Sequence, residues 1–232
     1  MESLLLPSKI RFTKGERPNE GILTFEPCEQ GYGTTIGNAL RRVLLSSLAG
    51  AAVTAVKIKG VDHEFSTMAY CKEDMLEIIL NLKTLRMKLH SEDPVKLSLS
   101  VKGEKIVTGE DFEKNADVEI VNPDLVIAHL TDKAASMEME ITVSPGRTYQ
   151  TTEERIKEKL ELGNISIDAL FSPVINVSYN VQATRVGEKT DYDKLVLNIE
   201  TDGTIDPLDA CQKAVAILLD HFSLLKDIEY EA

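Results

Sequence analysis

The sequence predicts an α+β fold of two domains, with an antiparallel sheet packed on two helices and an inserted mixed α/β domain. Both ends of the 232-residue chain show strand patterns followed by a helix pattern. The middle alternates in hydrophobicity over short stretches that charged turns separate. We therefore expect residues 1–49 and 172–232 to form one discontinuous domain, with residues 50–171 inserted as a second.

The amino-terminal region predicts two strands, over 10–13 and 22–25, and a helix over about 34–48. A glycine-containing turn, Gly31-Tyr-Gly33, precedes the helix. Glycine suits a turn that needs positive φ, and at Gly37 it suits close packing of the helix backbone. The same run of glycines invites a phosphate-binding interpretation, but it matches neither the P-loop nor the dinucleotide motif.

The middle region begins with a strand at 53–58 and a helix at about 74–82. Further short strands are expected over 95–101, 118–121 and 137–143. The charged stretch 149–164 is compatible with a loop, a short helix or both, and the alternatives stay open.

The carboxy-terminal region predicts a hairpin of strands 174–185 and 195–200, joined by a loop over 186–193. A final helix begins at Asp206-Pro207, with Asp206 as N-cap, Pro207 at the first helical position and Asp209 in the first turn.

Composition excludes several classes of protein. With 43% hydrophobic and 28% charged residues the chain is typical of a soluble globular protein. It has no apolar run near the roughly 20 residues of a membrane span and no signal-peptide pattern, so we expect a cytoplasmic protein without membrane contact. The net charge of −12 disfavours binding to nucleic-acid phosphates. The three widely spaced cysteines favour reduced, partly buried thiols.

No arrangement of residues predicts catalysis. The four histidines lie far apart and away from the cysteines, which disfavours a metal site. The many carboxylates form no marked catalytic pair, and no nucleophile-elbow motif is present. We expect no catalytic, cofactor-binding or metal-binding residues.

Each of the two predicted terminal helices has a second notable face. On helix 34–48 the core stripe contains Ile36, Leu40, Val43 and Leu44, and the opposite side carries Asn38, Arg41, Arg42 and Leu45. That opposite side suits either an interface patch or a solvated face with one stray leucine.

The final helix has one apolar row at Leu208, Cys211, Val215, Leu218, Phe222 and Leu225, and a second at Ala210, Ala214, Ile217, His221 and Leu224. Two rows indicate burial on two sides, either by a second copy of the chain or deep within one domain.

A long motif, FEPCEQGYGTTIGNALRRVLLSS over residues 25–47, resembles the signature of the bacterial RNA polymerase α subunit. Three more blocks agree in order: HEFST at 63–67, EDMLEIILNLK at 73–83, and a run over 172–207 that includes TDYDKL and GTIDP. The likeness extends over essentially the whole chain. It departs at Gln30, where the family has arginine, and over 149–164.

The resemblance implies a homodimeric assembly scaffold without a cofactor, which holds the β and β′ subunits of the polymerase. It implies dimerisation through both terminal helices, with contacts from Ile36, Leu40, Val43, Leu44, Val215, Leu218, Phe222 and Leu225. It carries β docking onto Arg42 and Leu45, flanked by Arg41 and Asn38. It carries β′ docking onto Lys83 and the hairpin 174–200, including Val174 and Arg185.

Family members continue past the position of Ala232 into a DNA- and activator-binding domain. We therefore expect this chain to be a shortened form and to make no direct DNA contact. The alternative to the scaffold is a free-standing homodimer that binds a ligand at the Gly31–Gly37 turn. A DNA-binding module is a third class, which the net charge opposes.

Overall fold

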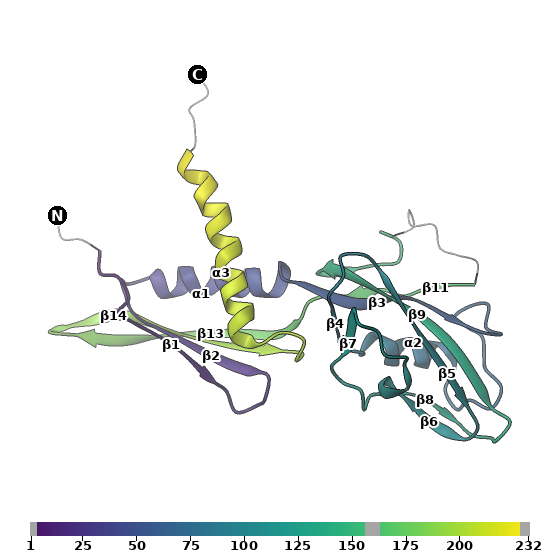
Figure 1. Cartoon of the computed structure of the whole chain (residues 1–232). Coiled ribbons are helices and arrows are strands. Elements are labelled where there is room, and N and C mark those ends of the chain that lie inside the picture. The colour runs from purple at the N-terminus through teal and green to yellow at the C-terminus, as the bar shows by residue number, and fades with distance from the viewer. Residues whose placement is uncertain (1–3, 156–162, 228–232) are drawn as a thin grey trace. The chain divides into compact units, whose positions relative to one another are not determined.

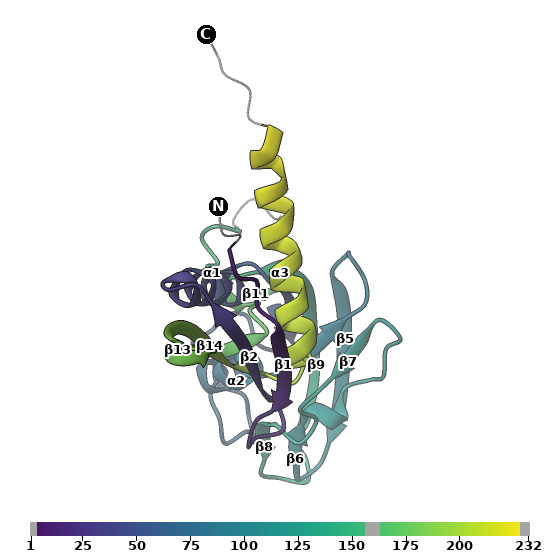
Figure 2. The same ribbon diagram turned by 90° about the vertical axis from the view of Figure 1, so that its left-hand side faces the viewer.

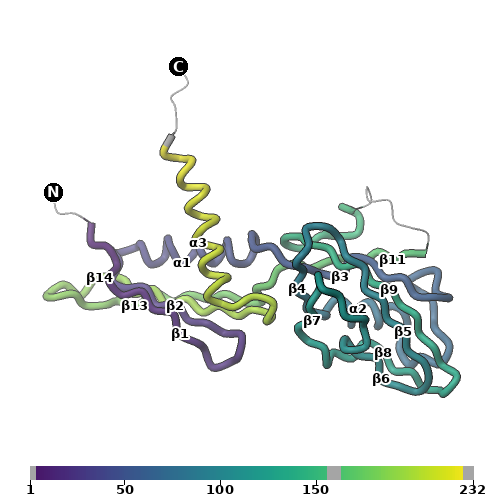
Figure 3. The backbone as a smooth tube through the Cα atoms, viewed as in Figure 1, coloured from purple at the N-terminus to yellow at the C-terminus, as the bar shows by residue number. Residues whose placement is uncertain are grey.

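The computed structural model describes residues 4–155 and 163–227 (Figure 1). They form two compact units. Unit 1 comprises the described residues up to Leu48 together with those from Pro173 onward, and unit 2 comprises Ala49–Ser172. The chain passes from the first helix directly into unit 2 and returns to unit 1 at Pro173 (Figure 3).

Unit 1 contains a four-stranded antiparallel sheet in the order β1-β2-β14-β13. Its strands are β1 (Lys9–Lys14), β2 (Glu20–Cys28), β13 (Val174–Val186) and β14 (Lys189–Thr201). In the central register, Leu197 of β14 lies opposite Leu23 of β2 on one side and Tyr179 of β13 on the other. This alignment puts apolar side chains of three strands on one face.

The β13–β14 hairpin corrects one prediction. The prediction of a loop over 186–193 is wrong, because Val186 pairs directly with Lys189 and only two residues form the turn. Gly187 begins that turn with φ +62°, a conformation that glycine adopts without strain. The charged residues at 189–191 are exposed, so strand pairing does not bury their charges.

Two helices cover the same face of this sheet. They are α1 (Tyr32–Ser46) and α3 (Pro207–Leu224), which a short 3₁₀ turn, η2 (Leu225–Asp227), follows. Asp206 caps α3 as predicted, since its Oδ1 accepts a hydrogen bond from the Leu208 nitrogen at 2.9 Å. α3 crosses α1, and its second half extends away from the sheet (Figures 1 and 2).

Unit 2 is built on the antiparallel sheet β11-β3-β9-β5, with helix α2 (Met75–Lys83) packed in its core. The sheet strands are β3 (Ala49–Ile58), β5 (Val95–Lys102), β9 (Ser136–Arg147) and β11 (Ile165–Ser166). Smaller pairs are β4 (Met87–Leu89) with β7 (Val118–Ile120), β6 (Lys105–Thr108) with β8 (Val126–Leu130), and β10 (Tyr149–Gln150) with β12 (Ala169–Leu170). A 3₁₀ turn, η1 (Gly109–Asp111), follows β6.

The strands and the helix expected in the middle region are confirmed. The sequence did not predict β4, β6, β8, β11 or β12, which have two to five residues each and carry too few alternations to be recognised. Of the stretch 149–164, residues 149–150 form β10 and 152–155 form a turn, while 156–162 lie outside the described residues.

Candidate assembly surfaces

The amino end of α1 is closed by the chain's own carboxylate. Gly31 has φ +88°, and Asp193 Oδ2 accepts hydrogen bonds from the Gly31 nitrogen at 2.8 Å and the Gly33 nitrogen at 3.1 Å. These backbone groups are the ones that a phosphate would need, and Asp193 would repel its charge. The turn therefore does not favour a ligand site, and positive φ accounts for Gly31 as predicted.

Gly37 lets α1 lie close to the sheet. A Cβ atom there would stand 2.8 Å from Leu195 Cδ1 and 2.8 Å from Tyr179 Cδ2, closer than atoms pack. The close packing expected at Gly37 is confirmed, because a Cβ atom there would overlap side chains of strands β13 and β14 unless they shifted.

The outward side of α1 is polar and exposed at Asn38, Arg41 and Arg42. Arg41 Nε donates to the Val177 carbonyl at 3.0 Å, so this side chain lies against β13. Within the described residues, the Arg42 guanidinium has no hydrogen bond or ion pair of its own. Leu45 is half-buried and packs against the core of unit 1, so it is not the free apolar anchor that the sequence suggested.

The opposite stripe of α1 belongs to the core of unit 1. Leu40 is 4% exposed and Leu44 is 0% exposed, while Ile36 and Val43 are half-buried and pack against the same core. The expectation that Leu40 and Leu44 contact a second copy must be revised. Their side chains are already enclosed by their own unit, so they present no surface.

The two apolar rows of α3 are distributed differently from the prediction. Ala210, Cys211 and Ala214 are buried, and Ile217 and Leu218 pack against the same core. A second row remains exposed; we call it the exposed α3 row, and it consists of Leu208, Val215, Leu219 and Phe222.

At about 100° per residue the exposed α3 row forms a continuous stripe beside the core stripe. Leu219 is 63% exposed. It was not included in either of the apolar rows predicted from the sequence, although it lies four residues after Val215. Leu218, by contrast, turns toward the core. Leu224 and Leu225 beyond the row are also exposed.

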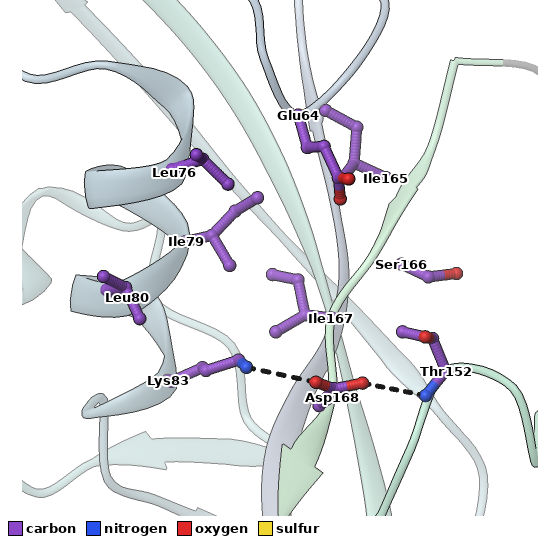
Figure 4. A pocket seen from close by; sticks show the side chains of 10 residues that line it. All are labelled: Glu64, Leu76, Ile79, Leu80, Lys83, Thr152, Ile165, Ser166, Ile167 and Asp168. Atoms are coloured by element: carbon purple, nitrogen blue, oxygen red, sulfur yellow. Dashed lines mark hydrogen bonds and ion pairs between the residues drawn. The ribbon is translucent and has the colours of Figure 1, made fainter.

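Lys83 lies at the end of α2, beside an open pocket of about 420 Å³ (Figure 4). Its Nζ pairs with Asp168 Oδ2 at 3.4 Å, and Asp168 Oδ1 accepts from the Thr152 nitrogen at 2.9 Å. The hydrogen bond from Thr152 is the main reason that the pKa of Asp168 lies below its usual value, with further lowering by Tyr149 and Lys83. Apolar side chains form much of the pocket wall: Leu76, Ile79, Leu80, Ile165 and Ile167.

The other two residues expected to bind β′ lie at opposite ends of β13. Val174 is 4% exposed and part of the core of unit 1, so its side chain presents no surface to a partner, and this expectation is revised. Arg185 is exposed, and its Nε donates to the Gly187 carbonyl at 2.7 Å within the hairpin turn. β13 therefore does not bring the two side chains together.

The described part of the chain contains no group of three or more histidine, cysteine or acidic side chains that could hold a metal ion. Its three cysteines are free thiols, buried at Cys28 and Cys211 and half-buried at Cys71. Burial is the largest cause that raises the pKa of all three thiols. None of the described helices combines the length and the apolar content needed to cross a membrane.

Comparison with known proteins agrees with the sequence motifs. Residues 56–172 match the family described as the RNA polymerase Rpb3/RpoA insert domain. A DNA-directed RNA polymerase subunit alpha of Symbiobacterium thermophilum is 50% identical over 212 residues, which cover 91% of this chain and 67% of that protein. The subunit alpha of Alkaliphilus oremlandii is 50% identical over 204 residues, covering 88% of this chain and 64% of that protein.

The subunit alpha of Carboxydothermus hydrogenoformans is 47% identical over 212 residues, which cover 91% of this chain and 67% of the relative. This chain thus spans about two thirds of the length of the relatives that it matches. Because the identity is this high over most of the chain and the insert-domain family matches half of it, the chain belongs to the family of bacterial DNA-directed RNA polymerase α subunits.

Proposed function

We propose that this chain is a non-catalytic scaffold of DNA-directed RNA polymerase. Two copies pair, and the dimer holds the β and β′ subunits, which contain the site of nucleotidyl transfer. The observation that carries the proposal is the exposed α3 row, an apolar stripe on a helix whose other stripe already fills the core. The relatives are named as subunit alpha of DNA-directed RNA polymerase, which supports a role for this chain within that complex.

The exposed α3 row suits pairing with a second copy. In a two-fold dimer each surface meets its own copy, so an apolar row on one helix is matched by an apolar row on the other. Phe222 is 57% exposed and Leu219 is 63% exposed. Burying them in a dimer removes apolar surface from water, which stabilises the dimer by about 25 cal/mol for each Å² buried. Ile36 and Val43 are half-buried and can add contacts at the edge of such an interface.

We place β docking on the outward side of α1. Arg42 presents an exposed guanidinium, which can form several directed hydrogen bonds with a partner and is typical of interface hot spots. Asn38 lies one turn before it on the same side. Arg41 and Leu45 flank this face and also hold α1 in place, the first through Val177 and the second through the core.

We place β′ docking on the surface around Lys83 and on the exposed end of the β13–β14 hairpin at Arg185. The pocket beside Lys83 combines an apolar wall with an ion pair (Figure 4). A partner can therefore insert an apolar side chain and form a polar contact with a charged group at the same place. Val174 takes no part in this proposal because it is buried.

In this proposal the chain has no active site of its own and does not bind DNA tightly. It acts in the cytoplasm, where the polymerase meets DNA. The net charge of −12 supports weak DNA affinity. The alternative of a ligand-binding dimer finds no support at the Gly31–Gly37 turn, because Asp193 occupies the amide groups there.

The decisive experiment is co-purification of tagged chain with separately produced β subunit and then with β′. We expect a stable complex with β that recruits β′. If the folded dimer captures neither subunit, the proposed function is wrong. In parallel, DNA affinity tighter than about 10⁻⁶ M at physiological salt would contradict the non-DNA-binding part, because that is the upper range of non-specific binders.

A further inference from the structure

We infer that Asp193 is a positioning residue for the β-docking side of α1: its carboxylate is a built-in anion that fixes the amino end of this helix on β14. The inference rests on the proposed function, because it concerns the docking side of α1. The residue lies near the turn-facing end of β14, far in sequence from α1 but in direct contact with it.

The strand places Asp193 on the face that meets the helices. Leu195, Leu197 and Ile199 are fully buried and alternate along β14, and Asp193 continues the same alternation two residues earlier. A charged side chain in a core-facing row is costly unless it is paired or hydrogen-bonded. Here the row has reached the amino end of α1, where backbone N–H groups are available.

An irregularity in the sheet accompanies this placement. Asp193 pairs with Cys28 and Leu195 pairs with Phe25, so β2 has one more residue than β14 between these pairs. Such bulges bend the strand and redirect side chains. The pairing is therefore interrupted at the point where the core-facing row changes from leucine to aspartate.

The helix lacks the usual means of satisfying its own amino end. Gly31 occupies the N-cap position and has no side chain to accept a hydrogen bond, and the first turn contains no acidic residue. Asp193 Oδ2 accepts from both the Gly31 and Gly33 nitrogens. A carboxylate is also the charge that the positive end of the helix dipole favours.

The second half of α1 has a further polar contact with the sheet, the hydrogen bond from Arg41 Nε to the Val177 carbonyl. Between the two contacts, Gly33 and Gly37 allow close contact: a Cβ at Gly33 would lie 3.0 Å from Val181 Cγ1. Without Asp193 the first turn of α1 loses this contact and can shift on β14, while Arg41, Leu40 and Leu44 still hold the second half of the helix. The direction of Asn38, which lies nearer the first turn than Arg42, then varies most, and fewer molecules present the complete face that a rigid partner can bind.

The test compares the full chain with Asp193→Ala, Asp193→Asn and Asp191→Ala for hydrogen exchange of residues 31–36, dimerisation and capture of β. Asp191 lies two residues away on the same strand, is exposed and serves as the matched control. We expect Asp193→Ala to accelerate exchange in the first turn of α1 and to weaken β capture by about threefold to tenfold, because the loosened first turn must become ordered again when β binds. Asp193→Asn keeps an acceptor oxygen but loses the charge, so its effect should be smaller, and Asp191→Ala should resemble the parent.

Added acetate separates charge from packing. In the Asp193→Ala protein, acetate can occupy the vacated position, so 0.2 M sodium acetate (roughly the excess that weak anion binding requires) should restore part of the β capture, and chloride at equal ionic strength should not. Equal response to the two salts, or β capture by Asp193→Ala within about twofold of the parent, overturns the inference. If Asp193→Ala does not fold, Asp193→Asn decides, and parental exchange and capture in that variant also overturn it.

Failure of this inference differs from failure of the proposed function. Absence of β capture by the parent chain contradicts the docking function itself. The hydrogen-exchange comparison requires no partner and still reports whether Asp193 fixes the amino end of α1.

Discussion

Glu73 contacts His129 twice in unit 2. Glu73 Oε2 accepts a hydrogen bond from the His129 backbone nitrogen at 2.6 Å, and Glu73 Oε1 lies 2.5 Å from the ring Nδ1. The Cys71 thiol also donates to Glu73 Oε2, at 3.8 Å. Burial by itself would raise the pKa of Glu73, but the backbone and ring contacts with His129 outweigh it and the pKa is lowered. These contacts connect the segment before α2, which contains Glu73, to strand β8, which contains His129.

This pair predicts a pH-dependent contribution to stability. Because the pKa of Glu73 is lower in the folded chain than its usual 4.5, the contribution is full above about pH 4.5 and is lost as pH falls through the folded-state pKa. At pH 7, Glu73→Gln should lower the free energy of unfolding by about 1–3 kcal/mol. The difference from the parent should shrink below pH 4.5, as measured by urea unfolding.

Glu104→Gln is the control for this measurement, since Glu104 is exposed. We expect it to unfold like the parent at every pH. A Glu73→Gln difference that stays constant between pH 7 and the acid range would show that packing, rather than the charge, is what the substitution removes.

Dimerisation through the exposed α3 row predicts a mass of twice 25.7 kDa by light scattering at micromolar concentration. Phe222→Asp should weaken the dimer by more than about 2 kcal/mol, roughly thirtyfold, because a buried interface would leave the charge without a partner. The resulting monomer should melt below the dimeric parent because it has lost its partner. Its core should be intact, since Phe222 is exposed in its own unit.

Lys213→Glu serves as the control, because it changes charge on the polar side of the same helix. It should leave the dimer intact. A parent chain that stays monomeric at all concentrations, or a Phe222→Asp protein that still dimerises, contradicts this interface.

The two sides of α1 predict opposite effects for neighbouring residues. Arg42→Ala should leave the melting temperature and the dimer unchanged but weaken β capture by about 2 kcal/mol, roughly thirtyfold. Val43→Ala should lower stability by about 1 kcal/mol, with β capture by the folded dimer retained, because Val43 packs against the core. Leu45→Ala should affect both measurements, since Leu45 is half-buried.

Pull-down of β and thermal melts of the three variants provide the comparison. An early melt of Arg42→Ala, or β capture equal to that of the parent, would show that the docking side of α1 is wrongly assigned.

Gly37→Ala should lift α1 away from the sheet. The new Cβ would meet Leu195 and Tyr179 at 2.8 Å, so we expect a loss of about 1–3 kcal/mol of stability in spite of the better helix propensity of alanine. Asn38→Ala, on the exposed side of the same helix, is the matched control and should be neutral or slightly stabilising. A Gly37→Ala protein that melts at or above the parent temperature would contradict the close packing.

Unit 2 should fold by itself. Its core contains residues from β3, α2, β5 and β9 and none from outside Ala49–Ser172 among the described residues. A fragment over 49–172 should therefore unfold cooperatively in urea. In the full chain, limited proteolysis should cut near the joints or within 149–164 before it cuts α1 or α3. First cleavage inside either helix would count against this division.

Much of the secondary structure could be predicted from residues close together in the sequence. Alternation predicted the long strands β3, β5 and β9, and helical spacing with Asp206-Pro207 predicted α3 and its first residue. These features depend on residues close together in the chain, for which the periodicity of 2 or 3.6 is a direct signal. The same spacing also separated Arg42 from Val43 on α1.

The tertiary structure decided which apolar residues remain available to a partner. Sequence periodicity gave Leu218 the same weight as Phe222, and the family resemblance added Leu40 and Leu44 to the dimer contacts, but only packing against a distant sheet determines which of them are enclosed. Asp193 gave no local signal either, because its partners Gly31 and Gly33 lie about 160 residues earlier in the chain. Periodicity reports the face on which a side chain lies, and contacts between distant segments determine what covers that face.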